Sequence, residues 1–411
     1  MDVLFLHPNF PGQFTRLAQR LNQEPDFQVY TLGDASWMSN QYTLPGAQHW
    51  AYEAPEPAGQ DTHRYVKNFD AAVRRGQQVV RTLLPHKHQG FEPDVIYVHP
   101  GWGDGLYLKE LFPAAQIISL FEYFYHARGA DVGFDPEFPL AFNDLFRLRT
   151  LNTVQLHALE GSDQKLSPTE WQRSRYPAAY RAAITCLHEG IDTARVVPDP
   201  QATLTLSNGL TLRAGDEVLT YVSRGLEPYR GFHCLMRALP EILRQRPRCQ
   251  VLIVGGDKAR YGPEPNQAAS WRELYLDELG GQMDLARVHF TGTLPYNDYL
   301  RVLQVSRAHV YLTYPFILSW SMMEAMAAGC LLLGSDTPPV RELLRHGENG
   351  LLFPFFEREA LVNQAVQALA EPERFEHLRR AAIAGIKSHY DFDTVVYPRH
   401  LALLRGLATP H

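Results

Sequence analysis

A chain of 411 residues is longer than one hydrophobic core usually serves, so we expect two domains with a cleft between them. The hydrophobic content of 45%, the net charge of -6 and the pI near 6.3 suit a globular protein and exclude a global basic field that would hold nucleic acid. The four cysteines lack CxxC spacing, so we expect reduced thiols and a cytoplasmic protein. No apolar run approaches the ~18 residues of a membrane-spanning helix, and peripheral contact with the inner membrane face stays open.

The first half of the chain alternates short apolar runs with helical patterns, which is typical of βα units that build a parallel sheet. Strands are predicted at Val3–Leu6, Gln28–Thr31, Val95–His99, Gln116–Phe121 and Gln164–Ser167. Helices are predicted at Phe14–Asn22, His63–Leu84 and Phe138–Glu160, with a further helix starting at Pro168–Trp171. The polar stretch at residues 196–216 indicates an exposed connection or hairpin, and we place the end of the first domain, residues 1–200, within it.

The second half repeats the same texture, which predicts another doubly wound domain over residues 201–390. Its strands are predicted at Glu217–Ser223, Gln250–Val254, Val288–Thr291, Ala308–Thr313, Leu331–Gly334 and Gly350–Phe353. Helices are predicted at Gly231–Arg244 and Ser270–Leu279. The expected fold class is therefore α/β, with two doubly wound, Rossmann-like domains that face each other across a cleft.

An irregular turn after the strand at residues 308–313 runs into an apolar helix that carries one carboxylate, Glu324. Open α/β sheets bind ligands at the carboxyl ends of their strands. Backbone N–H groups near Ser319–Met322 would face an anion at the helix start, and a phosphate group is the expected ligand. Glu324, one turn further in, is placed to accept hydrogen bonds from sugar hydroxyls. The alternative is an ordinary buried amphipathic helix with an exposed glutamate.

Three further strand ends of the second domain converge on the same predicted edge. Arg224 ends the first strand and Arg230 stands at the entry of the next helix, so their guanidiniums would flank one loop and match phosphate oxygens. Two solvated turn arginines are the alternative. Gly256, Thr293 and Leu294 follow two other strands and could admit a flat base against backbone groups.

The first domain presents a second group of candidate residues. In the loop at residues 7–14, Gly12 and Gln13 could cradle an anion or a polar acceptor, although a plain strand-to-helix turn uses the same residue types. His99 and Trp102 follow another strand and would line the wall of the cleft.

Two side chains after the next strand could take part in catalysis. Glu122 and His126 bring a carboxylate and an imidazole to the same face, where they could orient a hydroxyl or share a proton. The acidic run at residues 131–137 does not fit the spacing of a calcium loop, so we expect a solvated turn there and no metal site.

Taken together, these motifs resemble the retaining glycosyltransferases of family 4, also described as glycosyl transferases group 1, over nearly the whole sequence. The similarity is carried by Val222–Arg224 with Arg230-Gly231, Val254–Gly256, Phe290–Gly292, Glu324–Gly329 and His346–Leu352. Leu187–Asp192 is similar to the segment before the interdomain linker of that family, and Phe5–Phe14 is similar to a bacterial subgroup. The resemblance implies the two-domain GT-B fold, with residues 391–411 forming a C-terminal helix that crosses back onto the first domain.

The resemblance also implies roles for individual residues. Arg224 and Arg230 match the basic pair that grips the donor diphosphate, and Glu324 matches the acidic residue that binds the nucleotide ribose. The turn formed by Leu318, Ser319 and Trp320 would supply phosphate-binding amides. One position departs from the family: Phe316 stands where a second glutamate usually contacts the hydroxyls of the donor sugar.

The implied activity is that of an EC 2.4 transferase, which moves a sugar from a UDP-, GDP-, ADP- or dTDP-sugar to a glycan, a lipid-linked saccharide or a similar hydroxyl acceptor. The anomeric configuration would be retained, and no metal or other cofactor would be obligatory. A nucleotide-sugar epimerase or a sugar phosphorylase on the same fold is a second reading, although lysine, which a pyridoxal-dependent phosphorylase needs, is scarce near the proposed site. The loss of the glutamate at Phe316 leaves a third reading open, a catalytically altered nucleotide-binding scaffold or partner subunit.

Overall fold

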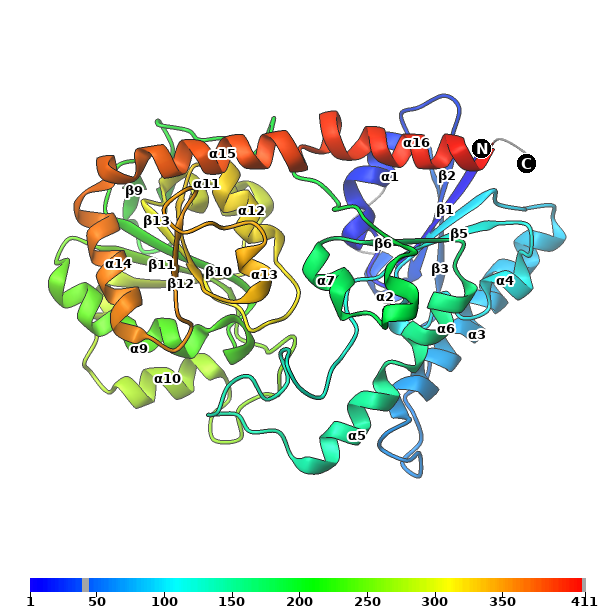
Figure 1. The fold of residues 1–411 in the computed structure, drawn as a ribbon, viewed down its shortest axis with the longest axis horizontal. Helices are drawn as coiled ribbons and strands as arrows, with labels where there is room; N and C mark the ends of the chain where they lie inside the picture. Colours follow the sequence, from blue (N-terminus) through cyan, green and yellow to red (C-terminus); the bar gives the residue numbers. More distant parts are fainter. Residues whose placement is uncertain (39–43, 409–411) are drawn as a thin grey trace. The chain divides into compact units, whose positions relative to one another are not determined.

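A computed structural model describes residues 1–38 and 44–408, and these form two compact units (Figure 1). Unit 1 contains Met1–Gly190 and the C-terminal segment from Phe392, and unit 2 contains Ile191–Asp391. The two passages of the chain between the units lie side by side, because the N–H of Ile191 donates to the carbonyl of Tyr390 at 2.7 Å. Residues 191–200, which the sequence analysis assigned to the first domain, therefore group with unit 2, and residues from 392 on group with unit 1.

The core of unit 1 is a seven-stranded parallel sheet in the order β3-β2-β1-β4-β5-β6-β7. Its strands are β1 Asp2–Leu6, β2 Gln28–Asp34, β3 Gln48–Tyr52, β4 Val95–Val98, β5 Gln116–Leu120, β6 Gln164–Ser167 and β7 Ile184–Cys186. The order reverses at β1, so the chain winds outward in both directions, as in a doubly wound sheet. Because helices cover both faces, the central strands read as continuous apolar runs rather than as alternating ones.

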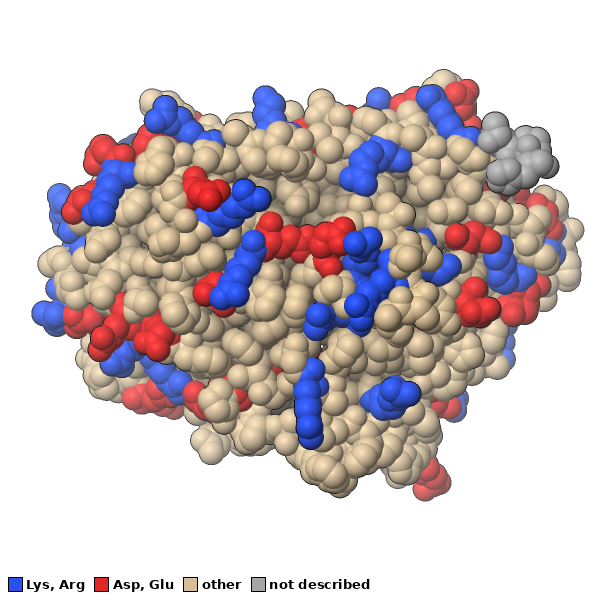
Figure 2. Space-filling model, viewed as in Figure 1, with Lys and Arg blue, Asp and Glu red and all other residues tan. Residues whose placement is uncertain are grey.

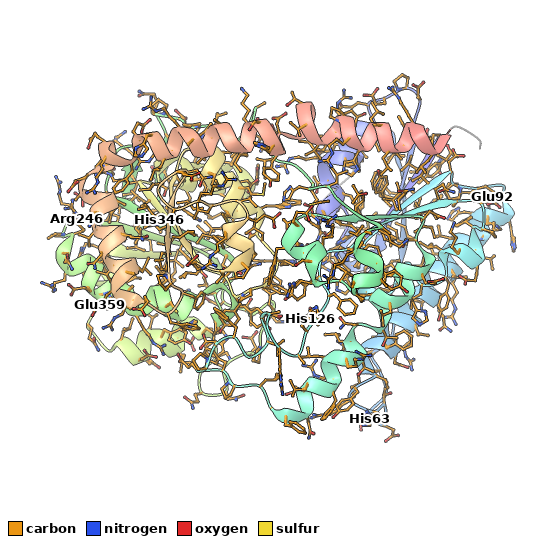
Figure 3. The ribbon with its side chains drawn as sticks, viewed as in Figure 1. His63, Glu92, His126, Arg246, His346 and Glu359 are labelled. Carbon is orange, nitrogen blue, oxygen red and sulfur yellow. The ribbon has the colours of Figure 1, made fainter. Side chains whose placement is uncertain are left out.

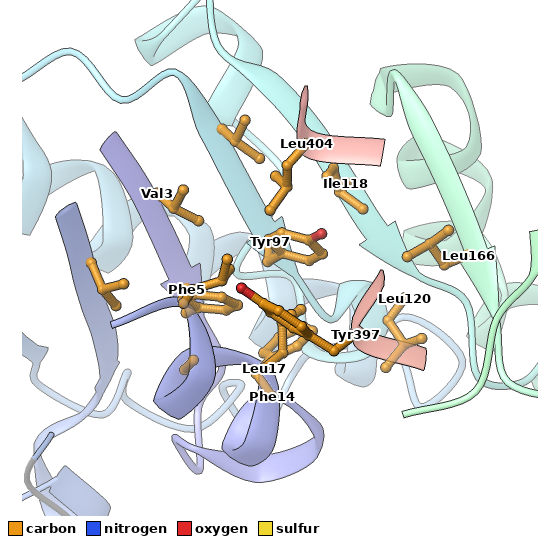
Figure 4. Close-up of a cluster of buried hydrophobic side chains, with 14 of the residues drawn as sticks. Val3, Phe5, Phe14, Leu17, Tyr97, Ile118, Leu120, Leu166, Tyr397 and Leu404 are labelled. Atoms are coloured by element: carbon orange, nitrogen blue, oxygen red, sulfur yellow. The ribbon is translucent and has the colours of Figure 1, made fainter. Parts of the chain in front are cut away.

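Helices close both faces of this sheet. The short and long helical segments of unit 1 are η1 Gly12–Phe14, α1 Thr15–Leu21, α2 Ala35–Met38, α3 Lys67–His88, η2 Pro100–Trp102, α4 Leu108–Leu111, α5 Phe142–Leu151, α6 Thr153–Gly161, α7 Glu170–Arg175, α8 Ala178–Arg181, the π-helical η6 Phe392–Val396 and α16 Tyr397–Ala408. On one face, Phe5 and Tyr97 pack with Leu17 of α1 and with Tyr397 and Leu404 from the C-terminal segment (Figure 4). On the other face, Leu4 and Ile96 pack against Val79 of α3 and Leu108 of α4.

Unit 2 repeats this plan with a six-stranded parallel sheet in the order β12-β11-β10-β13-β14-β15. Its strands are β10 Val218–Gly225, β11 Gln250–Gly256, β12 Val288–Gly292, β13 Ala308–Tyr311, β14 Leu331–Ser335 and β15 Leu351–Phe353, preceded by the antiparallel hairpin β8 Thr203–Thr205 and β9 Thr211–Arg213. The order reverses between β10 and β13, so ligands are expected in the crevice formed by the loops that follow these two strands.

The helical segments of unit 2 are η3 Pro228–Arg230, α9 Phe232–Gln245, α10 Trp271–Leu279, η4 Leu285–Arg287, α11 Tyr296–Val305, α12 Trp320–Ala327, α13 Pro338–Arg341, α14 Arg358–Ala370, η5 Pro372–Phe375 and α15 Glu376–Tyr390. One face is covered by α11, α12 and α15, whose buried residues Leu303, Met322 and Ile386 share a cluster with Leu332 of β14. Helix α14 packs on α9, which buries Leu235 and Leu239.

Some predicted elements differ from the observed ones. The edge strands β3 and β7 were not predicted, and the helix predicted at Phe138–Glu160 is broken into α5 and α6. The break falls at Asn152, whose side-chain oxygen accepts from the N–H of Tyr125 at 2.9 Å and whose amide donates to the carbonyl of the same residue at 2.8 Å. These two hydrogen bonds anchor the junction of α5 and α6 to Tyr125, a contact that apolar periodicity alone does not reveal.

Candidate functional site

The turn between β13 and α12 is held in place by a buried arginine. Arg230 is 4% exposed, and its Nη1 donates to the hydroxyl of Thr313 at 2.8 Å, to the carbonyl of Ile317 at 2.9 Å and to the hydroxyl of Tyr311 at 3.3 Å. The guanidinium carbon also lies 5.0 Å from the centre of the Tyr261 ring. Because these partners lie at the end of β13 and inside the turn, Arg230 fixes the path of the chain up to Ile317.

Neither predicted donor-binding arginine forms an ion pair with a carboxylate in the part of the chain that the structure describes, although the charge of the buried Glu227 acts on Arg230. Arg224 is exposed at the end of β10, and its side chain makes no hydrogen bond or ion pair with any residue the structure describes. Over residues 1–38 and 44–408, Arg230 likewise forms no ion pair with a carboxylate. A buried charge without an ion pair is costly, so the hydrogen bonds to the turn after β13 are what hold the Arg230 guanidinium in place. The two arginines are thus unequal: one is open to solvent and one is part of the scaffold.

A glycine allows the helix start at η3 to approach β13 closely. Gly231 has a φ of 65°, and a Cβ atom added there would lie 2.3 Å from the Cβ of Leu312. Both the left-handed backbone and the lack of space require glycine at this position. The carbonyl of Arg230 accepts from the hydroxyl of Tyr221 at 2.7 Å, which ties the same segment to β10.

Glu227 organises the loop after β11 and was missed by the sequence analysis. The side chain is fully buried, and its carboxylate accepts from the N–H groups of Arg260, Tyr261 and Gly262 at 2.9, 3.1 and 2.7 Å. Burial raises the pKa of Glu227, although the three N–H groups oppose that rise. A glutamate inside the Gly/Pro-rich loop between the two arginines was the available signal, but nothing local in the sequence points to a loop more than 30 residues away.

The position that departs from the family pattern is built into an aromatic cluster. Phe316 is 4% exposed, and its ring centre lies 5.1 Å from that of Tyr261 and 5.5 Å from that of Tyr229. Tyr229 in turn lies 4.8 Å from Tyr314. The guanidinium of Arg230 is 5.9 Å from the Phe316 ring centre. Aromatic rings and the Arg230 guanidinium therefore surround the side chain at position 316.

The start of α12 offers fewer free amides than the sequence analysis expected at Ser319–Met322. The N–H of Ser319 donates to the hydroxyl of Tyr311 at 2.8 Å, the N–H of Ser321 donates to the Ser319 hydroxyl at 3.3 Å, and the N–H of Met322 donates to the Ser319 carbonyl at 3.2 Å. The serine at the N-cap thus satisfies its own helix. Of the predicted turn amides, that of Leu318 forms no hydrogen bond within the described part of the chain, while Trp320 has other contacts.

The carboxylate of Glu324 is held by two tyrosines of α11. Glu324 is 4% exposed, and its Oε1 accepts from the hydroxyl of Tyr296 at 2.6 Å while its Oε2 accepts from the hydroxyl of Tyr299 at 2.8 Å. The alternative of an exposed glutamate on an ordinary helix is therefore wrong. Each carboxylate oxygen can accept a further hydrogen bond, so the phenols orient the group without exhausting it.

The residues predicted to surround a base lie together at the neighbouring strand ends. Gly256 ends β11, and a Cβ atom added there would lie 3.7 Å from the hydroxyl oxygen of Thr293, which follows β12. Thr293 is exposed and Leu294 is half-buried. The structure thus brings Gly256 and Thr293 side by side, at the same edge of the sheet as Arg224.

In unit 1, the structure brings together most of the predicted acceptor-side residues. Glu122 accepts from the side-chain amide of Gln13 at 3.0 Å through Oε1 and lies 3.3 Å from Nε2 of His99 through Oε2. The indole of Trp102 lies 4.5 Å from the His99 ring, and both lie against the ring of His7. These five residues, His7, Gln13, His99, Trp102 and Glu122, are called the unit 1 cluster below.

Gly12 and His126 take different places from the rest of the predicted set. An added Cβ at Gly12 would meet the His7 ring at 2.6 Å, so this glycine, with a φ of 49°, packs on the unit 1 cluster rather than lining it. His126, labelled in Figure 3, donates from Nε2 to the carbonyl of Arg175 at the end of α7 at 2.6 Å, and its ring lies 5.8 Å from that of Phe124. A carbonyl can only accept, so Nε2 of His126 carries a proton.

The acidic run at residues 131–137 is not the solvated turn that the sequence analysis expected. Asp131 accepts from the hydroxyl of Tyr123 at 2.8 Å, and Asp135 accepts from the N–H of Glu137 at 2.9 Å. Asp131 and Asp135 are buried and hydrogen-bonded, whereas Gly133, Pro136 and Glu137 are exposed.

Charged side chains of both signs are interspersed on the molecular face that Figure 2 shows. Among the helices that the structure describes, none combines the length and the apolar character needed to cross a membrane.

Two family models match the chain, one to each half. The glycosyl transferase family 4 group matches residues 27–196, and glycosyl transferases group 1 matches residues 205–385. Together they cover most of the chain, and their boundary falls near the junction of the two units.

Curated relatives share part of their length with this chain. A GDP-mannose-dependent alpha-(1-6)-phosphatidylinositol monomannoside mannosyltransferase from Mycolicibacterium smegmatis is 37% identical over 239 residues, which cover 54% of this chain and 55% of the relative. A glycogen synthase from Mycobacterium tuberculosis is 26% identical over 232 residues, covering 56% of this chain and 51% of the relative. The chain thus spans about half the length of the curated relatives it matches.

Solved structures of similar fold cover nearly the whole chain. Sucrose-phosphate synthase from Thermosynechococcus elongatus aligns with a TM-score of 0.73 and 18% identity over 99% of both chains. The HepE protein of Anabaena, solved in complex with UDP and glucose, aligns with a TM-score of 0.68 and 18% identity over 99% of this chain and 100% of its own. At this level of identity the likeness shows the fold, which is GT-B.

Proposed function

The chain belongs to the family 4 group of glycosyltransferases, and we propose that it transfers a sugar from a nucleotide-sugar donor to a hydroxyl acceptor with retention of the anomeric configuration. Unit 2 would bind the donor and unit 1 the acceptor. One observation carries the proposal: the buried guanidinium of Arg230 and the exposed one of Arg224 stand at the switch point of the unit 2 sheet without a carboxylate partner among the described residues. A nucleoside diphosphate supplies the missing negative charge.

Each part of the donor has a group of matching chemistry. Arg224 would donate directly to the diphosphate together with the N–H of Leu318, while Arg230 would add its charge and hold the turn. Glu324, oriented by its two tyrosines, would accept from the ribose hydroxyls. The base would lie at the strand ends beside Gly256 and Thr293. Negative charge that develops on the departing diphosphate would then be stabilised by groups already in place.

The relatives support this assignment by what their names state. The mycobacterial mannosyltransferase is described as GDP-mannose-dependent, and HepE was solved with UDP-glucose as well as with UDP and glucose. Both ligands are nucleoside diphosphate sugars. We therefore propose the same donor class for this chain, with uridine and guanosine diphosphate sugars as the first to test.

Titration calorimetry of the full chain with UDP, GDP, ADP and dTDP tests the donor site. We expect one of them to bind, and Glu324→Gln to weaken that nucleotide more than it weakens pyrophosphate. If no nucleoside diphosphate binds at millimolar concentration, the proposal fails. With the matching nucleotide sugar, the anomeric configuration of the product, read by NMR, decides between retention and inversion.

One observation favours a second candidate, a nucleotide-binding scaffold without transferase activity. The aromatic cluster around Phe316 replaces the carboxylate that would engage the donor sugar. Tight nucleotide binding with neither transfer nor hydrolysis of any nucleotide sugar would support the scaffold.

A further inference from the structure

We propose that the unit 1 cluster binds an uncharged saccharide acceptor, with a pyranose ring stacked on Trp102 and its hydroxyls donating to Glu122 and Gln13. This inference rests on the proposed function, which names no acceptor chemistry, and it commits the acceptor to a neutral sugar rather than a phosphorylated polyol or sugar.

Trp102 is a fixed, partly exposed aromatic surface. The residue is 40% exposed although its indole packs 4.5 Å from the His99 ring and 5.1 Å from the His7 ring. The turn that carries it is rigid at both ends, because Nδ1 of His99 accepts from the N–H of Gly101 at 3.1 Å and Gly103 ends the turn with a φ of 95°. A Cβ atom added to Gly103 would lie 2.4 Å from the Ala72 carbonyl oxygen, so the turn is pinned against α3.

Such a surface suits one side of a sugar ring. An indole offers a large apolar area at low conformational cost, and ligand sites combine such surfaces with a few convergent polar groups. The axial C–H bonds of a pyranose form an apolar face of comparable size, while its hydroxyls point outward to the rim.

The polar side chains beside Trp102 have oxygen atoms that can accept further hydrogen bonds. Since Nδ1 of His99 accepts from a backbone N–H, the ring proton of the neutral imidazole is on Nε2, which donates to Glu122. Each oxygen of Glu122 thus receives one hydrogen bond and can accept another, and its side chain remains 23% exposed. The side-chain carbonyl of Gln13 accepts no hydrogen bond from any residue that the structure describes. Carboxylate and amide oxygens lying side by side match the hydroxyls of a polyol.

The charge of this cluster disfavours an anionic ligand. Burial raises the pKa of Glu122, but the hydrogen bonds from His99 and Gln13 outweigh burial, so the pKa lies below its ordinary value and the group is an anion at neutral pH. No lysine or arginine side chain contacts Glu122, Gln13 or Trp102 within the described ranges. A phosphate brought to this place would meet a negative charge without a compensating cation.

The test compares neutral glycosides with a charged sugar phosphate, and the glucoside and glucose 6-phosphate share the same sugar. Methyl glucoside, methyl mannoside and methyl N-acetylglucosaminide are titrated against glucose 6-phosphate by saturation-transfer NMR on the full chain. We expect saturable binding of at least one neutral glycoside, tighter than that of glucose 6-phosphate. Trp102→Ala should weaken the glycoside about tenfold, which corresponds to about 1.4 kcal/mol. Trp37→Ala is the matched control, because Trp37 is 46% exposed in the same unit, and it should leave glycoside binding unchanged.

Glu122→Gln removes the charge of the side chain and leaves one carbonyl oxygen to accept from Gln13 or His99, so glucose 6-phosphate should gain on the neutral glycosides in this variant. The inference is overturned if no neutral glycoside binds at 50 mM, if glucose 6-phosphate binds more tightly than every glycoside, or if a folded Trp102→Ala protein binds glycosides like the wild type. Circular dichroism establishes the fold of each variant, and thermal melts compare their stability. The glycoside titrations need no nucleotide, so a failure of nucleotide binding counts against the proposed function and not against this acceptor site.

Discussion

The different surroundings of the two donor-side arginines predict two different mutant phenotypes. Arg224 is exposed and contacts no described side chain, so Arg224→Ala should leave the free energy of unfolding within about 0.5 kcal/mol of the wild type. Arg230 donates to three groups in the turn after β13, and Arg230→Met, which keeps much of the aliphatic length, should leave these groups without their donor.

The cost at Arg230 follows from its contacts. A hydrogen bond that involves a charged group contributes about 1.5–3 kcal/mol, and removing one member of a buried charged arrangement typically costs about 3–5 kcal/mol. Removing the guanidinium also removes its own desolvation penalty, which offsets part of that loss. We therefore expect Arg230→Met to destabilise unit 2 by about 3 kcal/mol.

Nucleotide affinity should respond to both substitutions. Loss of a charge-assisted contact with a diphosphate costs about 1.5–3 kcal/mol, which is about a 10- to 150-fold loss of affinity. Urea unfolding gives the stability, and calorimetry with the nucleoside diphosphate that binds the wild type gives the affinity. Arg213→Ala is the matched control, because Arg213 is also exposed but belongs to the hairpin before β10, at the other end of that strand from Arg224.

Specific outcomes would refute this reasoning. An Arg224→Ala protein that binds the nucleotide as well as the wild type would remove Arg224 from the donor site. An Arg230→Met protein that unfolds at the same urea concentration would show that the turn does not depend on this guanidinium. Equal losses of affinity in Arg224→Ala and Arg213→Ala would point to a general charge effect rather than to a contact.

Three further predictions each concern one side chain. Tyr299→Phe removes one of the two phenol hydroxyls that hold Glu324, and we expect it to lower the stability of unit 2 by about 1.5–3 kcal/mol. It should also lower the affinity for UDP or GDP more than the affinity for their 2′-deoxy analogues. Equal losses of affinity would exclude a ribose role for Glu324. Burial raises the pKa of Asp104 to about 6, so the native state holds the proton more tightly than the unfolded state, and this stabilisation is lost as the pH rises through 6. In urea titrations between pH 4 and pH 7, the free energy of unfolding of Asp104→Asn should therefore increase by up to about 3 kcal/mol relative to the wild type. A difference that stays constant with pH would contradict the raised pKa. Burial lowers the pKa of His400 to about 3, so the contribution of the neutral imidazole to stability is present above pH 6.5 and is lost as the pH falls. His400→Gln should therefore reduce the loss of unfolding free energy between pH 6.5 and pH 4 by up to about 3 kcal/mol. If the unfolding free energy of the variant falls with pH as steeply as that of the wild type, the assignment is wrong.

Local sequence patterns predicted the central strands well, because these strands are buried on both faces and read as uninterrupted apolar runs. The edge strand β3, with the sequence Gln48-His-Trp-Ala-Tyr52, lacks such a run, and its pairing with β2 is set by the partner strand rather than by its own composition. The junction at Asn152 is anchored to the backbone of Tyr125, and no helical periodicity contains that information.

The site was predictable to the level of residue type and strand end, but not to the level of contacts. The sequence indicated a buried helix with a carboxylate at residue 324, yet the two tyrosines that hold it lie 25 and 28 residues earlier on a different helix. The expected phosphate amides at Ser319–Met322 illustrate the opposite error, since the N-cap serine and Tyr311 use three of them. Long-range partners decide in both cases whether a polar group is available to a ligand.

The surroundings of Arg230 support the proposed donor site in unit 2. The Arg230 guanidinium is 4% exposed and forms no ion pair with a carboxylate in the described chain, although the charge of the buried Glu227 acts on it. Its three hydrogen bonds are made with hydroxyls and a carbonyl, which orient the cation without neutralising it. Under the proposed function, a positive charge held in this way would stabilise a departing diphosphate, because its field is in place before the bond breaks.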